Sequence, residues 1–278
     1  MSTETLPLGS APRSHPSLLR TFWVNARFAP RTSLGFMRLD FVLGTVFVLP
    51  FTQIVFFAYV AGLAGNPAIS VAYVAVGNAV ATMTYSSVFS VCQTTDMEKQ
   101  QYTLEHLLVS PANRAALYLG RGLVPVLLSF LTVGVSLGYA VGIFGAAVAP
   151  GALLPVTISV LLTSVAMVGF GLLLGGVALY LRTSIILGNI FLFIGLLLSG
   201  ANFPLSFLPV PLQWVGEALP LTWGIVAVRD SLSGTGWGPL LVAWAIVLGE
   251  GAASYALALG LWEVFERRAY RTGSLGRF

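Results

Sequence analysis

Residues 41–62 read FVLGTVFVLPFTQIVFFAYVAG and contain no charged side chain. A helix needs about 20 apolar residues to cross a hydrocarbon core about 30 Å thick, so this run is long enough to span a membrane. Five further apolar runs follow, near 69–91, 122–147, 153–181, 183–203 and 239–262. The sequence therefore predicts an all-α polytopic membrane protein with six transmembrane helices.

The composition excludes a water-soluble protein. Hydrophobic residues make up 56% of the 278 residues and charged residues only 9%, whereas soluble domains carry about 25% charged residues. The net charge of +4 is small, and no basic groove with interleaved aromatic residues indicates a nucleic-acid partner. One membrane domain over residues 18–262 is the simplest interpretation.

The chain lacks the residue types that several kinds of catalytic site require. Cys92 is the only cysteine, which rules out an intrachain disulfide and a CxxC metal or redox site. His15 and His106, the only histidines, lie outside the apolar runs and cannot build an intramembrane hydrolase or zinc site. The single lysine, Lys99, follows Glu98 and belongs to no GxxxxGK(S/T) phosphate-binding loop. We expect no enzymatic activity and no bound cofactor; if ATP powers this chain, a partner binds the ATP and Mg²⁺.

The two ends of the chain differ from the apolar runs. Residues 1–17 are rich in Ser, Pro and Thr, which predicts a flexible tail without a core. Over residues 18–31, apolar residues recur at helical spacing with arginines on another stripe. This pattern is typical of an amphipathic helix at a membrane surface, and a solvated basic tail is the alternative. Residues 263–278 are expected to form a basic cytoplasmic tail.

The basic residues predict the orientation of the spans. Thirteen of the fourteen Lys and Arg residues lie in the amino-terminal tail, the second-to-third loop, the fourth-to-fifth turn or the carboxyl-terminal tail. With six crossings these four regions share one face, which the positive-inside rule makes cytoplasmic. Arg229 is the exception, and it has Asp230 beside it in the sequence. We expect a multi-pass protein of the cell membrane with both termini in the cytoplasm.

The second-to-third loop carries an apolar stripe. Thr103 can cap a short helix and Pro111 then ends it. Within this helix one face is formed by Leu104, Leu107 and Leu108. An apolar face on a cytoplasmic helix indicates that another protein covers it. The leucines could equally rest on the membrane or on neighbouring helices.

The segment between the fifth and sixth runs is apolar but cannot be one straight helix. Residues 202–229 are interrupted by Pro204, Pro209, Pro211 and Pro220. Short helical pieces that dip into the outer leaflet, or lie on it, fit this pattern better. Non-helical backbone at membrane depth is tolerated only where protein or a water-filled cavity surrounds it, so this segment should line or cap such a cavity. The alternative is an ordinary external loop with aromatic anchors such as Phe203 and Trp214.

Glu250 lies in the middle of the sixth apolar run. A lipid-facing carboxylate there costs at least about 2.5 kcal/mol, so the side chain should face the protein interior. It could contact a substrate or gate its path, or it could bind hydroxyl groups of neighbouring helices. Both interpretations stay open.

Two motifs resemble the signatures of the permeases of ABC type-2 exporters. The first is EKQQYTLEHLLVSP at residues 98–111. It is similar to that family's acidic, Gly-Thr-Leu-Glu, leucine-rich, Ser/Thr-Pro motif, with Tyr102 in place of the customary glycine. The second is FPLSFLP at 203–209, followed by LPLT at 219–222 and by Arg229. The motifs occur in the family's order, and the resemblance extends over nearly the full chain.

The resemblance implies how such a chain works. Residues 98–111 would form a coupling helix that docks in a cleft of a separate ATPase subunit, with the amphipathic helix along the inner membrane surface. The Pro-broken segment would form two short re-entrant helices on the external side. Two permease chains, identical or homologous, and two ATPase chains would make the working unit in the lipid bilayer. The residues expected to couple to the ATPase are Glu98, Thr103, Leu104, Glu105, Leu107, Leu108, Pro111 and Arg114. Those expected at the external gate are Phe203, Pro204, Pro209, Pro220 and Arg229.

The function that this resemblance indicates is that of the permease subunit of an ATP-driven exporter. Its cargo would be a hydrophobic, drug-like, lipid or glycan molecule. Two other classes stay open, namely a secondary transporter driven by an ion gradient through Glu250 and a membrane assembly scaffold. Secondary transporters usually contain several intramembrane ionisable groups and an internal repeat. This sequence has one such carboxylate and no convincing repeat.

Overall fold

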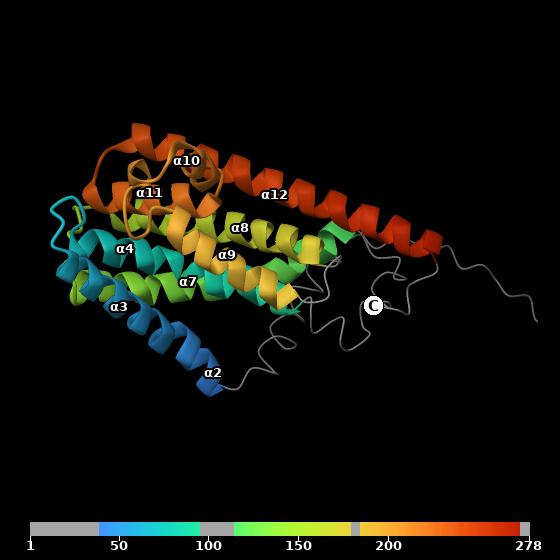
Figure 1. Ribbon diagram of the computed structural model, residues 1–278, viewed down its shortest axis with the longest axis horizontal. Coiled ribbons are helices and arrows are strands. Elements are labelled where there is room, and N and C mark those ends of the chain that lie inside the picture. The colour runs from blue at the N-terminus through green and yellow to red at the C-terminus, as the bar shows by residue number, and fades with distance from the viewer. Residues whose placement is uncertain (1–38, 95–113, 179–183, 273–278) are drawn as a thin grey trace, which may run out of the picture.

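The computed structural model describes residues 39–94, 114–178 and 184–272 (Figure 1). Every regular element within these ranges is a helix, which confirms the prediction of an all-α chain. In chain order the elements are α2 (Leu39–Leu43), the π-helical turn η1 (Gly44–Val48), α3 (Leu49–Ala64), α4 (Val71–Ala81), the π-helical turn η2 (Tyr85–Phe89), α7 (Arg114–Gly142), α8 (Leu153–Ala178), α9 (Ser184–Leu198), the 3₁₀ turn η3 (Leu205–Phe207), α10 (Val210–Glu217), α11 (Pro220–Ser233) and α12 (Trp237–Thr272).

Five helical stretches in the described residues are long and apolar enough to cross a membrane. They are Gly44–Ala64, Val71–Thr94, Gly122–Gly142, Leu153–Val177 and Trp237–Val264. These stretches correspond to the first, second, third, fourth and sixth apolar runs of the sequence. A multi-pass membrane protein is therefore confirmed.

The fifth predicted span, 183–203, corresponds to the shorter helix α9. Its 15 residues, Ser184–Leu198, rise about 22 Å at 1.5 Å per residue, which is less than the hydrocarbon core of about 30 Å. The helix ends shortly before Gly200, which has a left-handed backbone (φ 74°) that an α-helix cannot continue. The described chain thus contains five long spans and one shorter helix, and the predicted count of six full spans is not confirmed.

Two other helix ends differ from the predicted ones. α7 ends at Gly142 and not at 147, and Gly145 follows with a left-handed backbone (φ 67°). α12 continues to Thr272, beyond the predicted end at 262 and into the basic tail. Residues 263–272 contain no glycine or proline, so nothing in their backbone chemistry interrupts the helix where the apolar run stops.

The first two spans each contain a π-helical turn that the apolar pattern did not reveal. η1 lies at the start of the first span, and η2 lies in the second half of the second span. A π-turn accommodates an extra residue inside a helix, and such turns are frequent at functional sites. The two spans therefore cannot pack against each other there as two regular α-helices would.

The second span lies at the centre of the bundle (Figure 1). In the most apolar 18-residue part of Val71–Thr94, 83% is buried inside the bundle, against 28% for the first and the last span. Its first part, α4, packs against α3, α7 and α11, while α8 packs against α7, α11 and α12. The buried residues of α4, from Val74 to Ala81, are mostly small. Small residues allow the neighbouring backbones to approach closely.

The bundle has two different ends (Figure 1). The connections 65–70, 143–152 and 199–236 lie together at one end, which we call the α11 end. A hydrogen bond from the N–H of Ala149 to the carbonyl of Leu232 (2.8 Å) joins two of them. The helix ends that border the undescribed segments lie towards the opposite end, namely Thr94, Arg114, Ala178, Ser184 and Thr272. Successive helices therefore alternate in direction, as membrane crossings require.

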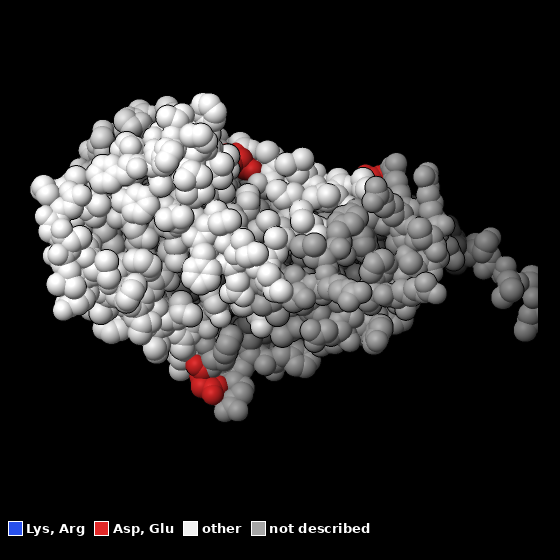
Figure 2. All heavy atoms as spheres, viewed as in Figure 1, with Lys and Arg blue, Asp and Glu red and all other residues white. Residues whose placement is uncertain are grey.

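The described surface is largely apolar. Figure 2 shows a face on which acidic side chains are few and no described Lys or Arg is visible. Large exposed hydrophobic side chains lie on the first span, α9 and α12, for example Tyr59, Leu63, Phe193 and Leu241. A continuous apolar surface of this kind is suited to contact with lipid chains or with another membrane protein.

Gly251 of α12 faces α8, and its replacement by alanine should destabilise the bundle. An added Cβ would lie 2.9 Å from the Cβ and 3.0 Å from the Cα of Ala166, so the two helices would have to separate. Gly249→Ala is the matched control, because nothing lies within 4 Å of its added Cβ and both substitutions gain the same helix propensity. Relative to this control, Gly251→Ala should lower the free energy of unfolding by about 1–3 kcal/mol. Chemical denaturation of the purified protein in mild detergent measures the difference, and equal stabilities would contradict the packing.

Candidate functional site

Part of the predicted site lies outside the described residues. This applies to the amphipathic helix predicted at 18–31 and to the following coupling residues: Glu98, Thr103, Leu104, Glu105, Leu107, Leu108 and Pro111. Arg114 is the first residue of α7. The predicted gate residues and Glu250 are all described.

Three predicted gate prolines stand at the starts of short helical pieces. Pro204 directly precedes η3, Pro209 directly precedes α10, and Pro220 is the first residue of α11. Proline suits these positions because the first residues of a helix need no N–H donor and the fixed φ of proline is helical. Short helices therefore lie between the fifth and sixth runs, and their re-entrant position stays a prediction. Phe203 lies partly buried just before the first of them.

Side chains and close packing hold α10 and α11 against the end of α9. The hydroxyl of Thr222 donates to the carbonyl of Gly216, and the indole N–H of Trp223 donates to the carbonyl of Glu217 (2.9 Å). Gly216 in turn lies against the carbonyl of Leu198, where an added Cβ would overlap the oxygen. A glycine is therefore required at this contact.

Arg229 joins three separate parts of the chain at the α11 end. Its Nη1 donates to the carbonyl of Gly200 (3.0 Å), and its Nη2 donates to the carbonyls of Ala201 (3.0 Å) and Tyr73 (2.9 Å). The guanidinium carbon lies 3.4 Å from the centre of the Tyr73 ring, which is a cation–π contact. We call this set of contacts the Arg229 clamp. It connects α11, α4 and the segment after α9.

The clamp matches the electrostatics of a helix end. The carbonyls of Gly200 and Ala201 lie just past the last residue of α9, where the helix dipole is negative and a cation is favoured. The carbonyl of Tyr73 lies in the first turn of α4. Burial lowers the pKa of Arg229 to about 10, with Tyr73 acting in the opposite direction, and the guanidinium therefore stays charged at neutral pH. Asp230 does not face Arg229, because adjacent residues of a helix point in different directions.

Gly77 leaves the space that the clamp occupies. A Cβ at this position would overlap the carbonyl oxygen of Ala201 and the guanidinium of Arg229. Tyr73 lies one turn earlier on α4, and its hydroxyl donates to the carbonyl of Gly200 (3.3 Å). The face of α4 that receives Arg229 thus combines an aromatic ring with a missing side chain.

A network of amide side chains lies beside the clamp. Nδ2 of Asn78 donates to Oδ1 of Asn202 (2.8 Å), and Nε2 of Gln53 donates to Oδ1 of Asn78 (3.2 Å). Nδ2 of Asn202 donates to the carbonyl of Leu196 (3.2 Å). The sequence interpretation missed these residues and Tyr73. The available signal was the presence of amides inside apolar runs, because a polar group in a span is costly unless it is bonded.

Glu250 lies on α12 and takes no part in the clamp. The residue is partly buried, and its Oε2 has no hydrogen-bond partner among the residues that the structure describes. Its neighbour Gly251 packs on Ala166 of α8. Glu250 therefore lies at the margin of the contact between α12 and α8.

The fold and these contacts define an α-helical membrane protein whose spans are joined at one end by short helices and buried polar groups. Residues 28–232 match the family model described as ABC-2 type transporter, which covers more than half of the chain. The chain belongs to the ABC-2 type transporter family, as a permease-type membrane domain. A comparison with curated proteins gave no significant match. The matched range includes residues 98–111 and the Arg229 clamp, whereas Glu250 lies beyond it.

Replacement of Arg229 should weaken the α11 end in proportion to the donors that are lost. Arg229→Leu leaves three carbonyls without their charged donor, and we expect a loss of about 2–4 kcal/mol in the free energy of unfolding. Arg229→Lys keeps the charge without the planar fork of donors, so it should be intermediate. Asp230→Asn is the control and should change stability by less than about 0.5 kcal/mol. Denaturation in mild detergent measures all three, and the clamp would be refuted if Arg229→Leu behaved like Asp230→Asn.

Proposed function

We propose that this chain is the membrane-spanning permease subunit of an ABC exporter and works with a separate ATPase subunit. The observation that carries the proposal is the family match over residues 28–232, which takes in the motif at 98–111 and the short helices after α9. The sequence contains no phosphate-binding loop. In this proposal ATP and Mg²⁺ are bound by the partner, and the permease supplies the path through the membrane.

Residues 98–111 are proposed to form the coupling helix. They connect the second span to α7, and the facing ends Thr94 and Arg114 lie opposite the α11 end (Figure 1). The leucine stripe would enter a cleft of the ATPase, and closure of the two ATPase chains would push on both spans at once. The partner must bind one conformation of the permease more tightly than the other, because a ligand with equal affinities shifts no equilibrium.

The Arg229 clamp and the short helices are proposed as the external gate, with α10 and α11 entering the outer leaflet. The second span offers a direct connection between gate and ATPase. It carries Tyr73 of the clamp in its first turn and ends at Thr94, next to the proposed coupling helix. A tilt of this helix would therefore act on the contacts of Arg229. Opening then requires breaking charge-assisted hydrogen bonds, which are stronger than neutral ones.

The working unit is proposed to contain two permease chains, identical or homologous, and two ATPase chains. The first span and α12 are each only 28% buried, so lipid or a second permease would cover their apolar faces. The cargo is proposed to be a hydrophobic, drug-like, lipid or glycan molecule. Glu250, at the margin of the α12 face, would contact either this cargo or neighbouring helices.

Leu107→Asp should uncouple ATP hydrolysis from transport while the permease still inserts in the membrane. A carboxylate in the docked leucine stripe would lose its hydration without gaining a partner. We expect the amount of ATPase that co-purifies with the full-length permease to fall by about tenfold or more. Quantitative mass spectrometry of the purified complex measures the ratio of ATPase to permease. The amount of cargo transported into inverted vesicles per ATP hydrolysed measures the coupling.

Gln100→Asp is the matched control for this experiment. It adds the same charge at the start of the same segment, before the capping Thr103 and away from the leucine stripe that is proposed to dock, so it should change both readouts far less than Leu107→Asp does. Full coupling in Leu107→Asp would contradict the docking role of residues 98–111. Absence of any ATPase chain from the wild-type preparation would contradict the proposed function as a whole.

The proposed orientation can be tested by labelling introduced cysteines in intact cells. Cys92 is buried, so the native chain should give almost no background. Ala68→Cys, in the exposed connection after α3, should react with a membrane-impermeant maleimide. Ser274→Cys should react only after the membrane is permeabilised. Labelling of both variants in intact cells would contradict an even number of crossings.

A further inference from the structure

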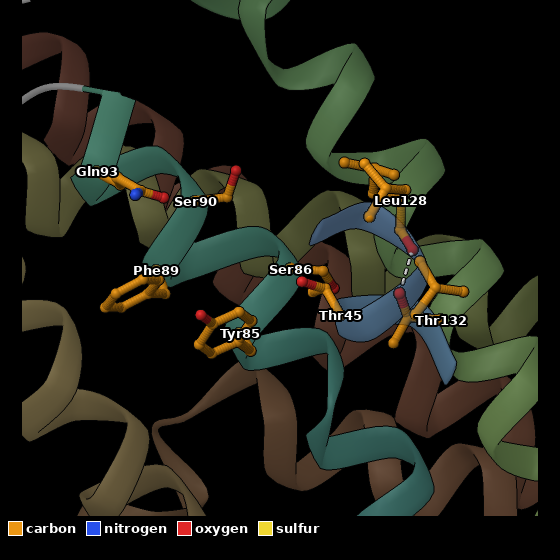
Figure 3. A pocket seen from close by; sticks show the side chains of 10 residues that line it. Thr45, Tyr85, Ser86, Phe89, Ser90, Gln93, Leu128 and Thr132 are labelled. Carbon is orange, nitrogen blue, oxygen red and sulfur yellow. Dashed lines mark hydrogen bonds between the residues drawn. The ribbon is translucent and has the colours of Figure 1, made fainter. Parts of the chain in front are cut away.

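A hollow lies between the two π-helical turns and α7 (Figure 3). Its volume is about 30 Å³, its apolar wall is formed by Val42, Val46 and Leu128, and Tyr85, Ser90 and Gln93 also line it. It is distinct from the Arg229 clamp, which involves the first turns of α4 and not η2. None of the ten side chains drawn in Figure 3 is charged at neutral pH.

The π-turns explain why the hollow is not filled by the protein. η1 and η2 both contribute to its wall, and an extra residue in each helix prevents the regular interlocking of ridges and grooves. The space is therefore a consequence of backbone geometry.

The polar groups of the hollow fall into two sets. The hydroxyl of Thr132 donates to the carbonyl of Leu128 (2.7 Å), and that of Ser86 donates to Ser129 (3.1 Å). By contrast, the structure gives the side-chain polar groups of Tyr85, Ser90 and Gln93 no hydrogen-bond partner among its described residues. A phenol, a hydroxyl and a carboxamide thus lie on successive turns of one helix, as Figure 3 shows, and each can donate a hydrogen bond to a ligand.

The hollow opens onto an exposed, largely apolar part of the bundle surface. The lining residues Val42, Ser90 and Gln93 are themselves partly exposed. Large apolar side chains adjacent to the wall are more exposed, with Leu43 at 47% and Leu131 at 51%. A ligand can therefore enter sideways from the hydrocarbon region without crossing an aqueous surface.

We propose that this hollow binds the ester-bearing end of one acyl chain of a neutral membrane lipid. The first methylene groups would lie against Val42, Val46 and Leu128, where burial of apolar surface is favourable. The ester oxygens would accept hydrogen bonds from Tyr85, Ser90 and Gln93. An uncharged lining does not favour an anionic head group. A volume of about 30 Å³ is far below the roughly 300–1,000 Å³ of drug sites, so it takes a segment of a flexible chain.

Photolabelling of the full chain in vesicles of ether-linked phosphatidylcholine, whose chains carry no ester that could compete, tests this proposal without any ATPase, so its outcome does not depend on the proposed function. The probe is a trace of diacylglycerol with a diazirine near the ester of one chain. Mass spectrometry should find label on Val42 and Leu128 well above that on Phe193, which is 69% exposed on α9. Unlabelled diacylglycerol should compete for the hollow, whereas phosphatidic acid should compete at least about fivefold less well.

Two variants separate the hollow from general lipid contact. Ser90→Leu fills the space and should reduce labelling of Leu128 more than about tenfold. Thr94→Leu is the matched control, because Thr94 lies one turn further on the same helix and is exposed, and it should label as the wild type does. Tyr85→Phe combined with Gln93→Leu removes two donors and should weaken competition by about fivefold.

Three results would overturn the proposal. The first is equal labelling of Phe193 and the hollow in the wild type, which indicates bulk lipid contact only. The second is equal competition by phosphatidic acid and diacylglycerol, which removes the case for a neutral head group. The third, read from a separate reaction with a bifunctional crosslinker, is linkage of the hollow to a second copy of the chain, which makes it a protein interface. The first two need no variant, so a misfolded variant leaves the test intact.

Discussion

A backbone carbonyl that ends inside a membrane protein needs a donor from the protein itself, because lipid provides none. After α9 this donor is Arg229, which serves the carbonyls of Gly200 and Ala201 and also binds that of Tyr73 in the first turn of α4. One guanidinium therefore holds the end of α9, the start of α4 and the middle of α11 in a single arrangement. The short helices and the amide network around Asn78 lie next to the Arg229 clamp.

Close packing and hydroxyl bonds hold the rest of the bundle together. Lipid is as apolar as the helix surfaces, so spans associate through small residues and polar contacts. Gly224 of α11 leaves room for Thr163 of α8, and the indole of Trp244 on α12 donates to the hydroxyl of Ser159 on α8 (2.8 Å). α8 is therefore a common support for α11 and α12, and a movement of either helix has to be accommodated by the other.

The second span connects the two irregular regions of the molecule. It carries Tyr73 and Gly77 of the clamp near its start and the π-turn of the hollow near Tyr85. The end of α4 at Ala81 and a turn at Thr82 lie between them, and this part of the span is largely buried by its neighbours. A rigid, buried rod with special geometry near both ends is suited to transmit a shift from one side of a membrane to the other.

The sequence alone determined the all-helical, multi-pass character and the interruption of the segment after α9 at its prolines, because run length and proline chemistry act locally. It did not reveal the shortness of α9 or the two π-turns, which apolar periodicity does not record. The role of Arg229 was decided by tertiary structure. Its partner Tyr73 lies 156 residues away in the chain, and the space that admits its side chain exists because Gly77 has no Cβ. Sequence neighbours suggested Asp230 instead, but only the folded backbone shows which carbonyls need a donor.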